Sequence, residues 1–248
     1  MVTLTREYKK IKSTSKYMEV MSRIAVLADI HSNLPAFREV MKELKGYNPE
    51  LYLIAGDIVG YNPFPNEVIA DLMRIPRKHV ILGNHDRALI TGDTSWFNAS
   101  AADAIRWTKK HLTNKLYLKF LSTRREKERL LIGNRHVLLC HGAPWDPDEY
   151  IMSSQVHEDL LTENRVDILI LGHTHIPFVK EYASGLVMNP GSVGQPRDGD
   201  PRASAAILDI EELKVEPIRV EYDIDSVADA IVKAGLSENL ATRLYYGV

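Results

Sequence analysis

The chain has 248 residues, of which 45% are hydrophobic, so it is long enough and apolar enough to form a globular domain. Its 31 basic side chains nearly balance 33 acidic ones, which leaves no excess of positive charge for nucleic acid or an anionic membrane. The one cysteine, Cys140, has no disulfide partner, and we therefore expect a cytoplasmic protein.

Residues 1–21 are interpreted as a basic N-terminal extension. They carry several lysines and an arginine but no apolar run of the length found in signal peptides. No later stretch reaches the roughly 18 apolar residues that a membrane-spanning helix needs. We expect a single domain over residues 22–248.

Five short apolar runs indicate buried strands in the first two thirds of the chain. They are residues 24–28, 51–55, 80–82, 137–140 and 168–171. Residues 35–44 and 66–74, which lie between the first three runs, have the amphipathic spacing of helices. Unbroken apolar runs that alternate with helices are typical of an α/β fold, whose largely parallel strands are buried on both faces.

The later part of the chain predicts a second set of shorter strands joined by turns, and this favours two packed sheets. These strands are residues 177–182, 186–189, 204–210 and 214–222. Residues 97–122 show helical patterns without a strand and predict a helical insertion or lid. Residues 226–247 predict two helices split at Gly235. The alternating charges of residues 124–129 favour a solvated turn over a nucleic-acid patch.

Side chains that bind metals follow each of the five apolar runs. They are Asp29 with His31, Asp57, Asn84 with His85, His141, and His173 with His175. The carboxyl ends of parallel strands meet at one edge of a sheet, so these five points should converge in one crevice. Asp29 and His31 form an i, i+2 pair, as do His173 and His175. The two side chains of each pair should point to the same side if strand geometry continues through them.

The types of these side chains indicate which metals they bind. Asp, Asn and His without Cys favour Mn, Fe, Zn, Co or Ni over a structural thiolate zinc site. A single ion would leave ligands unused, so we expect two ions. Asp57 is the natural bridge between them, with one oxygen for each ion.

The motifs DIHSN (29–33), GD (56–57), GNHD (83–86), HG (141–142) and GHTH (172–175) stand in a characteristic order. With them the chain resembles the calcineurin-like metallophosphoesterases, in their compact bacterial and archaeal branch, over roughly residues 22 to 247. The resemblance implies a four-layer αββα sandwich of two mixed β-sheets flanked by helices. It also implies two ligand sets: Asp29, His31, Asp57 and His175 for one ion, and Asp57, Asn84, His141 and His173 for the other.

The resemblance further implies a phosphoesterase that acts on phosphomonoesters or phosphodiesters, of small molecules or nucleotides, through metal-activated hydroxide. Manganese is the favoured ion. His85 would be the catalytic histidine, protonated and oriented by Asp86, and would protonate the leaving group. Arg197, in a Gly/Pro-rich loop, and Asn33, at the start of the first helix, are candidate phosphate contacts.

Other functions stay open at this point. A phosphoprotein phosphatase is one, although the small chain has no obvious peptide groove. A non-enzymatic protein-binding scaffold, like the retromer subunit of this fold, is another, although that subunit lacks the histidine that His85 matches. We expect a small phosphate ester as the partner, disfavour nucleic acid and membranes, and leave a homo-oligomer open. Trp145 and Tyr150 either wall the substrate pocket or only pack.

Overall fold

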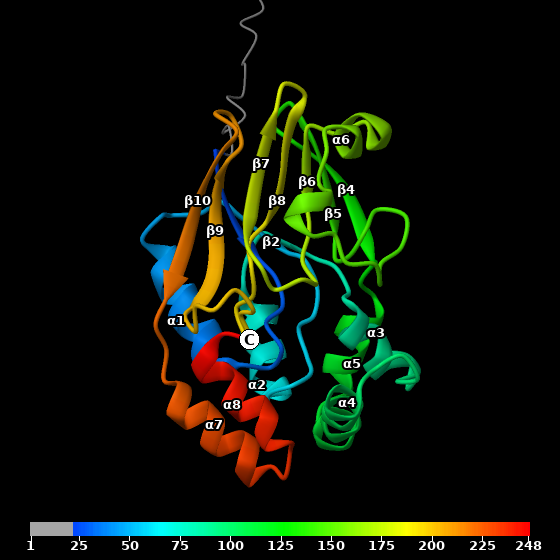
Figure 1. Cartoon of the computed structure of the whole chain (residues 1–248), viewed down its shortest axis with the longest axis vertical. Coiled ribbons are helices and arrows are strands. Elements are labelled where there is room, and N and C mark those ends of the chain that lie inside the picture. The colour runs from blue at the N-terminus through cyan, green and yellow to red at the C-terminus, as the bar shows by residue number, and fades with distance from the viewer. Residues whose placement is uncertain (1–21) are drawn as a thin grey trace, which may run out of the picture.

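The computed structural model describes residues 22–248, so the extension predicted for residues 1–21 lies outside the described residues. Two five-stranded sheets pack face to face, with helices on their outer sides (Figure 1). The first sheet has the order β10-β9-β1-β2-β3 and the second the order β4-β5-β6-β8-β7. None of the helices in this part of the chain is long and apolar enough to cross a membrane.

The strands of the first sheet are β1 (Arg23–Leu27), β2 (Leu51–Ile54), β3 (Lys78–Val80), β9 (Ala203–Asp209) and β10 (Lys214–Val220). Those of the second are β4 (Lys127–Ile132), β5 (Arg135–Cys140), β6 (Ile168–Ile170), β7 (Phe178–Tyr182) and β8 (Gly185–Asn189). The helices are α1 (Leu34–Lys45), α2 (Pro65–Arg74), α3 (Asn84–Thr91), α4 (Ala99–His111), α5 (Lys115–Ser122), α6 (Asp159–Asn164), α7 (Ile224–Lys233) and α8 (Glu238–Tyr246).

The alternation of side chains along the strands builds the four layers. In β1, Ala25 and Leu27 belong to the core that includes α1 and α2, whereas Ile24 and Val26 belong to the core between the two sheets. On the far side of the second sheet, side chains of β5 and β6 pack against Leu161 of α6. The predicted αββα sandwich of two mixed sheets is therefore confirmed.

The strands are not divided between the sheets in chain order. β9 pairs antiparallel with β1, and β10 follows it, so these late strands complete the first sheet. β5 and β6, which belong to the early apolar runs, lie in the second sheet and pair in parallel. The late strands thus do not form a sheet of their own. Almost every side chain of β9 is buried, as expected for a strand inside a sheet.

Residues 127–132 form the edge strand β4, so the prediction of a solvated turn over residues 124–129 was wrong for its second half. β4 pairs antiparallel with β5 from Lys127 opposite Cys140 to Ile132 opposite Arg135. Its charged side chains suit a sheet edge, where they keep other strands from adding on. The helices predicted within residues 97–122 are confirmed as α4 and α5, and the terminal pair as α7 and α8.

Cys140 ends β5 and is only 2% exposed, and its burial raises the pKa of the thiol to about 12. With such a pKa, roughly one molecule in 10⁴ would carry a thiolate at pH 8, and the thiolate is the reactive form. Iodoacetamide should therefore leave the folded protein unmodified and label it after denaturation, as measured by intact mass. Native labelling at the rate of a free cysteine would contradict this burial.

Candidate metal centre

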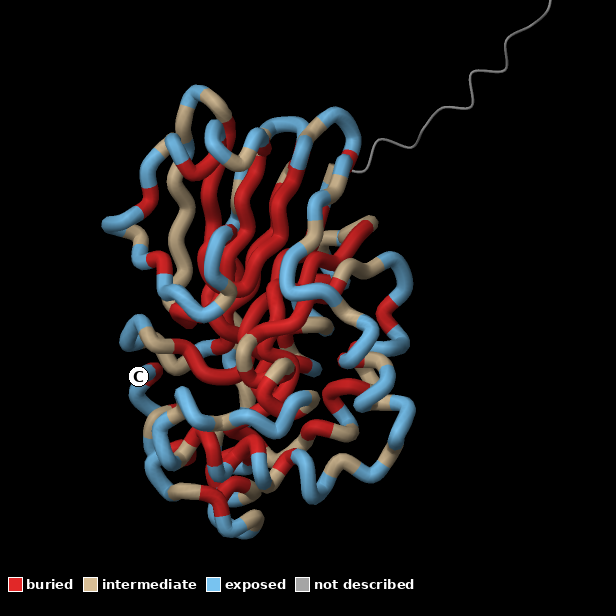
Figure 2. Tube along the Cα trace, turned by 90° about the vertical axis from the view of Figure 1, so that its right-hand side faces the viewer, coloured by how far each residue is buried: buried red, intermediate tan, exposed pale blue. Residues whose placement is uncertain are grey.

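The loops that follow β1, β2, β3, β5 and β6 meet where the two sheets end (Figure 1). Backbone hydrogen bonds join these loops: Asp29 N donates to Gly56 O over 3.1 Å, and Gly172 N donates to His141 O over 2.9 Å. The buried segments run from the strands into the middle of the molecule (Figure 2). The predicted convergence of five chain points in one place is thus present.

Strand geometry does not continue through the two i, i+2 pairs, so that part of the prediction was wrong. β1 ends at Leu27 and β6 at Ile170, before either pair begins. Five residues of the centre have left-handed φ between 48° and 68°: Asp29, His31, Asp57, His173 and His175. Such backbone is unfavourable for residues with a Cβ and tends to occur at functional sites. Tight turns, rather than extended strands, bring these side chains together.

Two groups of buried side chains bring their ligand atoms within 4.8 Å of one another. The first is Asp29, His31, Asp57 and His175, and the second is Asp57, His141 and His173. Asn84 adjoins the second group, with Oδ1 3.1 Å from Nε2 of His141. The structure therefore gathers all seven predicted ligands into two sets that share Asp57.

One oxygen of Asp57, rather than two, faces both groups. Oδ1 accepts a hydrogen bond from the backbone N–H of His85 at 2.9 Å. Oδ2 lies 3.5 Å from Nε2 of His31 and 3.3 Å from Nε2 of His141. The expectation of one oxygen for each ion is corrected accordingly, and Oδ2 is the atom placed to contact both.

The buried imidazoles of the centre fit a bound cation. Nδ1 of His31, His141 and His175 lies 3.0, 2.7 and 2.6 Å from a backbone carbonyl oxygen, respectively. Carbonyls only accept, so Nδ1 carries a proton in each ring, and in the neutral rings of His31 and His175 Nε2 presents a lone pair. Nε2 of His31 and Nε2 of His175 are 3.1 Å apart. Two lone pairs at this distance repel each other unless a cation lies between them.

His173 has the opposite orientation. Its Nε2 donates to the carbonyl oxygen of Asp148 at 3.1 Å, which leaves Nδ1 as the nitrogen available to an ion. The ring also stacks on Tyr150, with 3.9 Å between centroids and 20° between planes. The loop that contains Asp148 and Tyr150 thus holds His173 in position.

The pKa values of Asp29 and Asp57 are shifted in opposite directions. Burial raises the pKa of Asp29 to about 8. Burial alone would also raise the pKa of Asp57, but the charge of His141 and the neighbouring imidazoles hold it well below its usual range. Burial lowers the pKa of His31 and of His175. A metal ion at the first group would therefore compete with a proton on Asp29.

Asp86 does not orient the ring of His85, contrary to the expectation from the sequence. Its carboxylate accepts hydrogen bonds from the backbone N–H groups of Ile58, Val59 and Gly83 at 3.0–3.2 Å. Within residues 22–248 nothing is hydrogen-bonded to Nδ1 of His85. Asp86 therefore fixes the loops that carry Asp57 and Asn84.

His85 is 4% exposed and lies among aromatic rings. Phe97 stacks on it at 4.6 Å between centroids, and Tyr61 lies 4.5 Å away. Burial lowers the pKa of His85 to about 4, so the ring is neutral at pH 7 rather than protonated as expected. Phe97 was not predicted as a residue of the site. The only signal for it in the sequence is its position at the start of the predicted lid.

The two predicted phosphate contacts differ in their surroundings. Arg197 is half-buried and donates from Nη2 to Tyr61 Oη at 3.2 Å and to Gln195 Oε1 at 3.0 Å, and its charge helps to lower the pKa of His175. Asn33 is fully buried; its Oδ1 caps α1 through Ala36 N, and its Nδ2 donates to Gly194 O. Both polar groups of Asn33 are thus engaged within the protein, which argues against a contact with phosphate.

A family model of the calcineurin-like phosphoesterase superfamily domain matches residues 22–213. The chain is 38% identical over 246 residues to the uncharacterized protein MJ0912 of Methanocaldococcus jannaschii. This alignment covers 92% of the present chain and 99% of MJ0912. It is 25% identical over 217 residues to phosphodiesterase YfcE of Escherichia coli. This alignment covers 84% of the present chain and 98% of YfcE.

The crystal structure of a metallophosphoesterase from Sphaerobacter thermophilus is similar, with a TM-score of 0.76 and 33% identity, over 92% of this chain and 99% of that one. The chain therefore belongs to the calcineurin-like phosphoesterase superfamily and is a metal-dependent phosphoric ester hydrolase.

Proposed function

We propose that this protein hydrolyses small phosphodiesters or phosphomonoesters with two divalent metal ions, of which manganese is the favoured one. The observation that supports this proposal most is the pair of ligand groups that share Oδ2 of Asp57. The similarity to phosphodiesterase YfcE supports diesters as substrates. The single buried cysteine supports a reducing compartment such as the cytoplasm.

Seven side chains would hold the ions. Asp29, His31, Asp57 and His175 would bind one, and Asp57, Asn84, His141 and His173 the other. When bound, such ions neutralise phosphate charge and activate water as the nucleophile. The protein contributes the fixed tautomers described above and a buried site in which electrostatic interactions are strong.

His85 is the proposed hydrogen-bond donor to the substrate. Its Nδ1 is closed off against Gly60, since a Cβ on Gly60 would lie only 2.4 Å from that nitrogen. Nε2 is therefore the ring nitrogen that can act on a phosphoryl or leaving-group oxygen. A neutral imidazole still donates one N–H, so this role does not need the protonated ring. Arg197 adds positive charge beside the first ligand group.

Turnover of simple esters tests the proposed function. Protein loaded with Mn²⁺ should hydrolyse bis(p-nitrophenyl) phosphate or p-nitrophenyl phosphate, followed by absorbance of the phenolate. Chelation with EDTA should abolish the rate, and added Mn²⁺ should restore it, because the bound ions would activate the water that attacks phosphorus. Metal-replete protein that turns over neither ester would contradict the proposal.

Asp57→Asn should lower the metal content at both positions, because the shared oxygen loses its charge. We expect about two ions per chain in the wild type and fewer than one in the variant, measured by elemental analysis. Asp71→Asn is the matched control, since Asp71 forms surface ion pairs with Arg38 and Arg74. Two ions retained by Asp57→Asn would rule out a shared carboxylate.

His85→Ala should lower kcat by about 10²–10⁴-fold while both metals stay bound. Gly60→Ala should act in the same direction, because its new Cβ would displace the ring. Gly133→Ala controls for backbone strain: Gly133 also has positive φ, but nothing lies within 4 Å of its Cβ position. Unchanged kcat in His85→Ala would remove the ring from the mechanism.

A further inference from the structure

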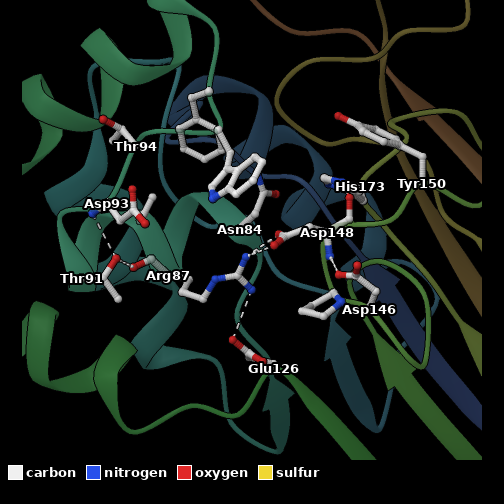
Figure 3. Close-up of a pocket in the computed structure, with 14 residues that line it drawn as sticks. Asn84, Arg87, Thr91, Asp93, Thr94, Glu126, Asp146, Asp148, Tyr150 and His173 are labelled. Carbon is white, nitrogen blue, oxygen red and sulfur yellow. Dashed lines mark hydrogen bonds and ion pairs between the residues drawn. The ribbon is translucent and has the colours of Figure 1, made fainter.

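A cavity of about 780 Å³ opens beside the candidate metal centre, and the ligands Asn84 and His173 form part of its wall. Side chains of α3, Glu126 and two loops form the rest. One follows α3 and carries Asp93 and Thr94, and the other follows β5 and carries Asp146, Asp148 and Tyr150, with Arg87 between them (Figure 3). The substituent of an ester whose phosphate lay at the metal ligands would reach this space.

Each loop presents an aromatic side chain to the cavity. Trp96 lies in the first loop and is 92% exposed, and Tyr150 lies in the second and is 48% exposed. Both loops are anchored on imidazoles of the centre, since Phe97, next to Trp96, stacks on His85, and Tyr150 stacks on His173. Exposed aromatic surface beside a reaction centre is suited to binding a planar apolar group.

The charge around the cavity is unsuited to a second anionic group. The one guanidinium in its wall, that of Arg87, is occupied by ion pairs with Asp148 and Glu126. Asp93 and Asp146 also line it, and neither has an ion-pair partner among residues 22–248. Carboxylates that face a cavity repel a ligand phosphate and so exclude it.

We propose that this cavity holds an uncharged aromatic group of the substrate, such as an aryl ring or a nucleobase, and disfavours esters that carry a second phosphate. The proposal rests on the proposed function, because the phosphoryl group must occupy the metal centre for its substituent to enter the cavity. Trp96 and Tyr150 contribute the stacking surface, and the carboxylates contribute the selection by charge.

Three phosphonates that are not hydrolysed test this selection. Calorimetric titration of the Mn²⁺-loaded full chain would compare methylphosphonate, phenylphosphonate and 1,4-phenylenediphosphonate, at a pH where the first two are both dianions. We expect phenylphosphonate to bind about tenfold more tightly than methylphosphonate, as one stacked ring contributes. The diphosphonate should bind more weakly than phenylphosphonate, because its second charge enters the cavity.

Trp96→Ala should reduce the phenyl-to-methyl affinity ratio to near one. Trp145→Ala is the matched control and should keep the wild-type ratio, since Trp145 is an exposed indole next to Asp146 that does not line the cavity. Equal affinity of the two monophosphonates for the wild type, or an unchanged ratio in Trp96→Ala, overturns the aromatic subsite. Tighter binding of the diphosphonate overturns the selection by charge.

These titrations do not depend on turnover, so the two proposals fail separately. Hydrolysis of bis(p-nitrophenyl) phosphate without the affinity ratio would keep the proposed function and remove the aromatic subsite. The affinity ratio without hydrolysis of any ester would keep the subsite and remove the proposed function.

Discussion

The mutual repulsion of buried donor atoms at the ends of two sheets is the constraint on which the rest of this structure depends. Asp29 is fully buried and Asp57 is 1% exposed, and burial of a carboxylate costs several kcal/mol unless a cation pairs with it. Nε2 of His31 and Nε2 of His175 face each other with their lone pairs. Divalent cations would turn these unfavourable contacts into ligand bonds, so the free energy of folding and that of metal binding are linked.

The fold holds the centre in place through residues that would not touch a metal. Asp86 binds three backbone N–H groups and fixes the loops after β2 and β3. Asn33 caps α1 and joins it to the loop that contains Gly194. Asn33 lies in the DIHSN motif and Asp86 in the GNHD motif, and both motifs suggest a role in binding or catalysis. Their hydrogen bonds instead give both side chains a structural role. Five left-handed residues in the centre add backbone strain that these hydrogen bonds offset.

Local pattern was sufficient to predict most of the elements and the ligands. Apolar runs of strand length are followed by Asp, Asn or His, and parallel strands bring such ends together. The order of motifs along the chain was therefore enough to predict the ligands of the site. Local pattern could not predict which strands share a sheet, because the pairing of β9 with β1 joins residues far apart in sequence. β4 was missed because its alternating charges resemble those of an exposed turn.

The same limit applies to the details of the site. The role of Asp86 is decided by backbone groups in the loop after β2, 27 and 28 residues earlier in the chain. The cavity beside the centre depends on Trp96 and Tyr150, which stand in different loops, and neither carries a motif of its own. The neutral state of His85 follows from burial against Phe97 and Tyr61, which only the folded chain reveals.

Anomalous diffraction from crystals loaded with manganese would test most directly whether Asp57 joins two metal ions. We expect two peaks about 3.5–4 Å apart, with Oδ2 of Asp57 between them. One peak should lie among Asp29, His31 and His175, and the other among Asn84, His141 and His173. A single peak, or peaks away from Asp57, would contradict it.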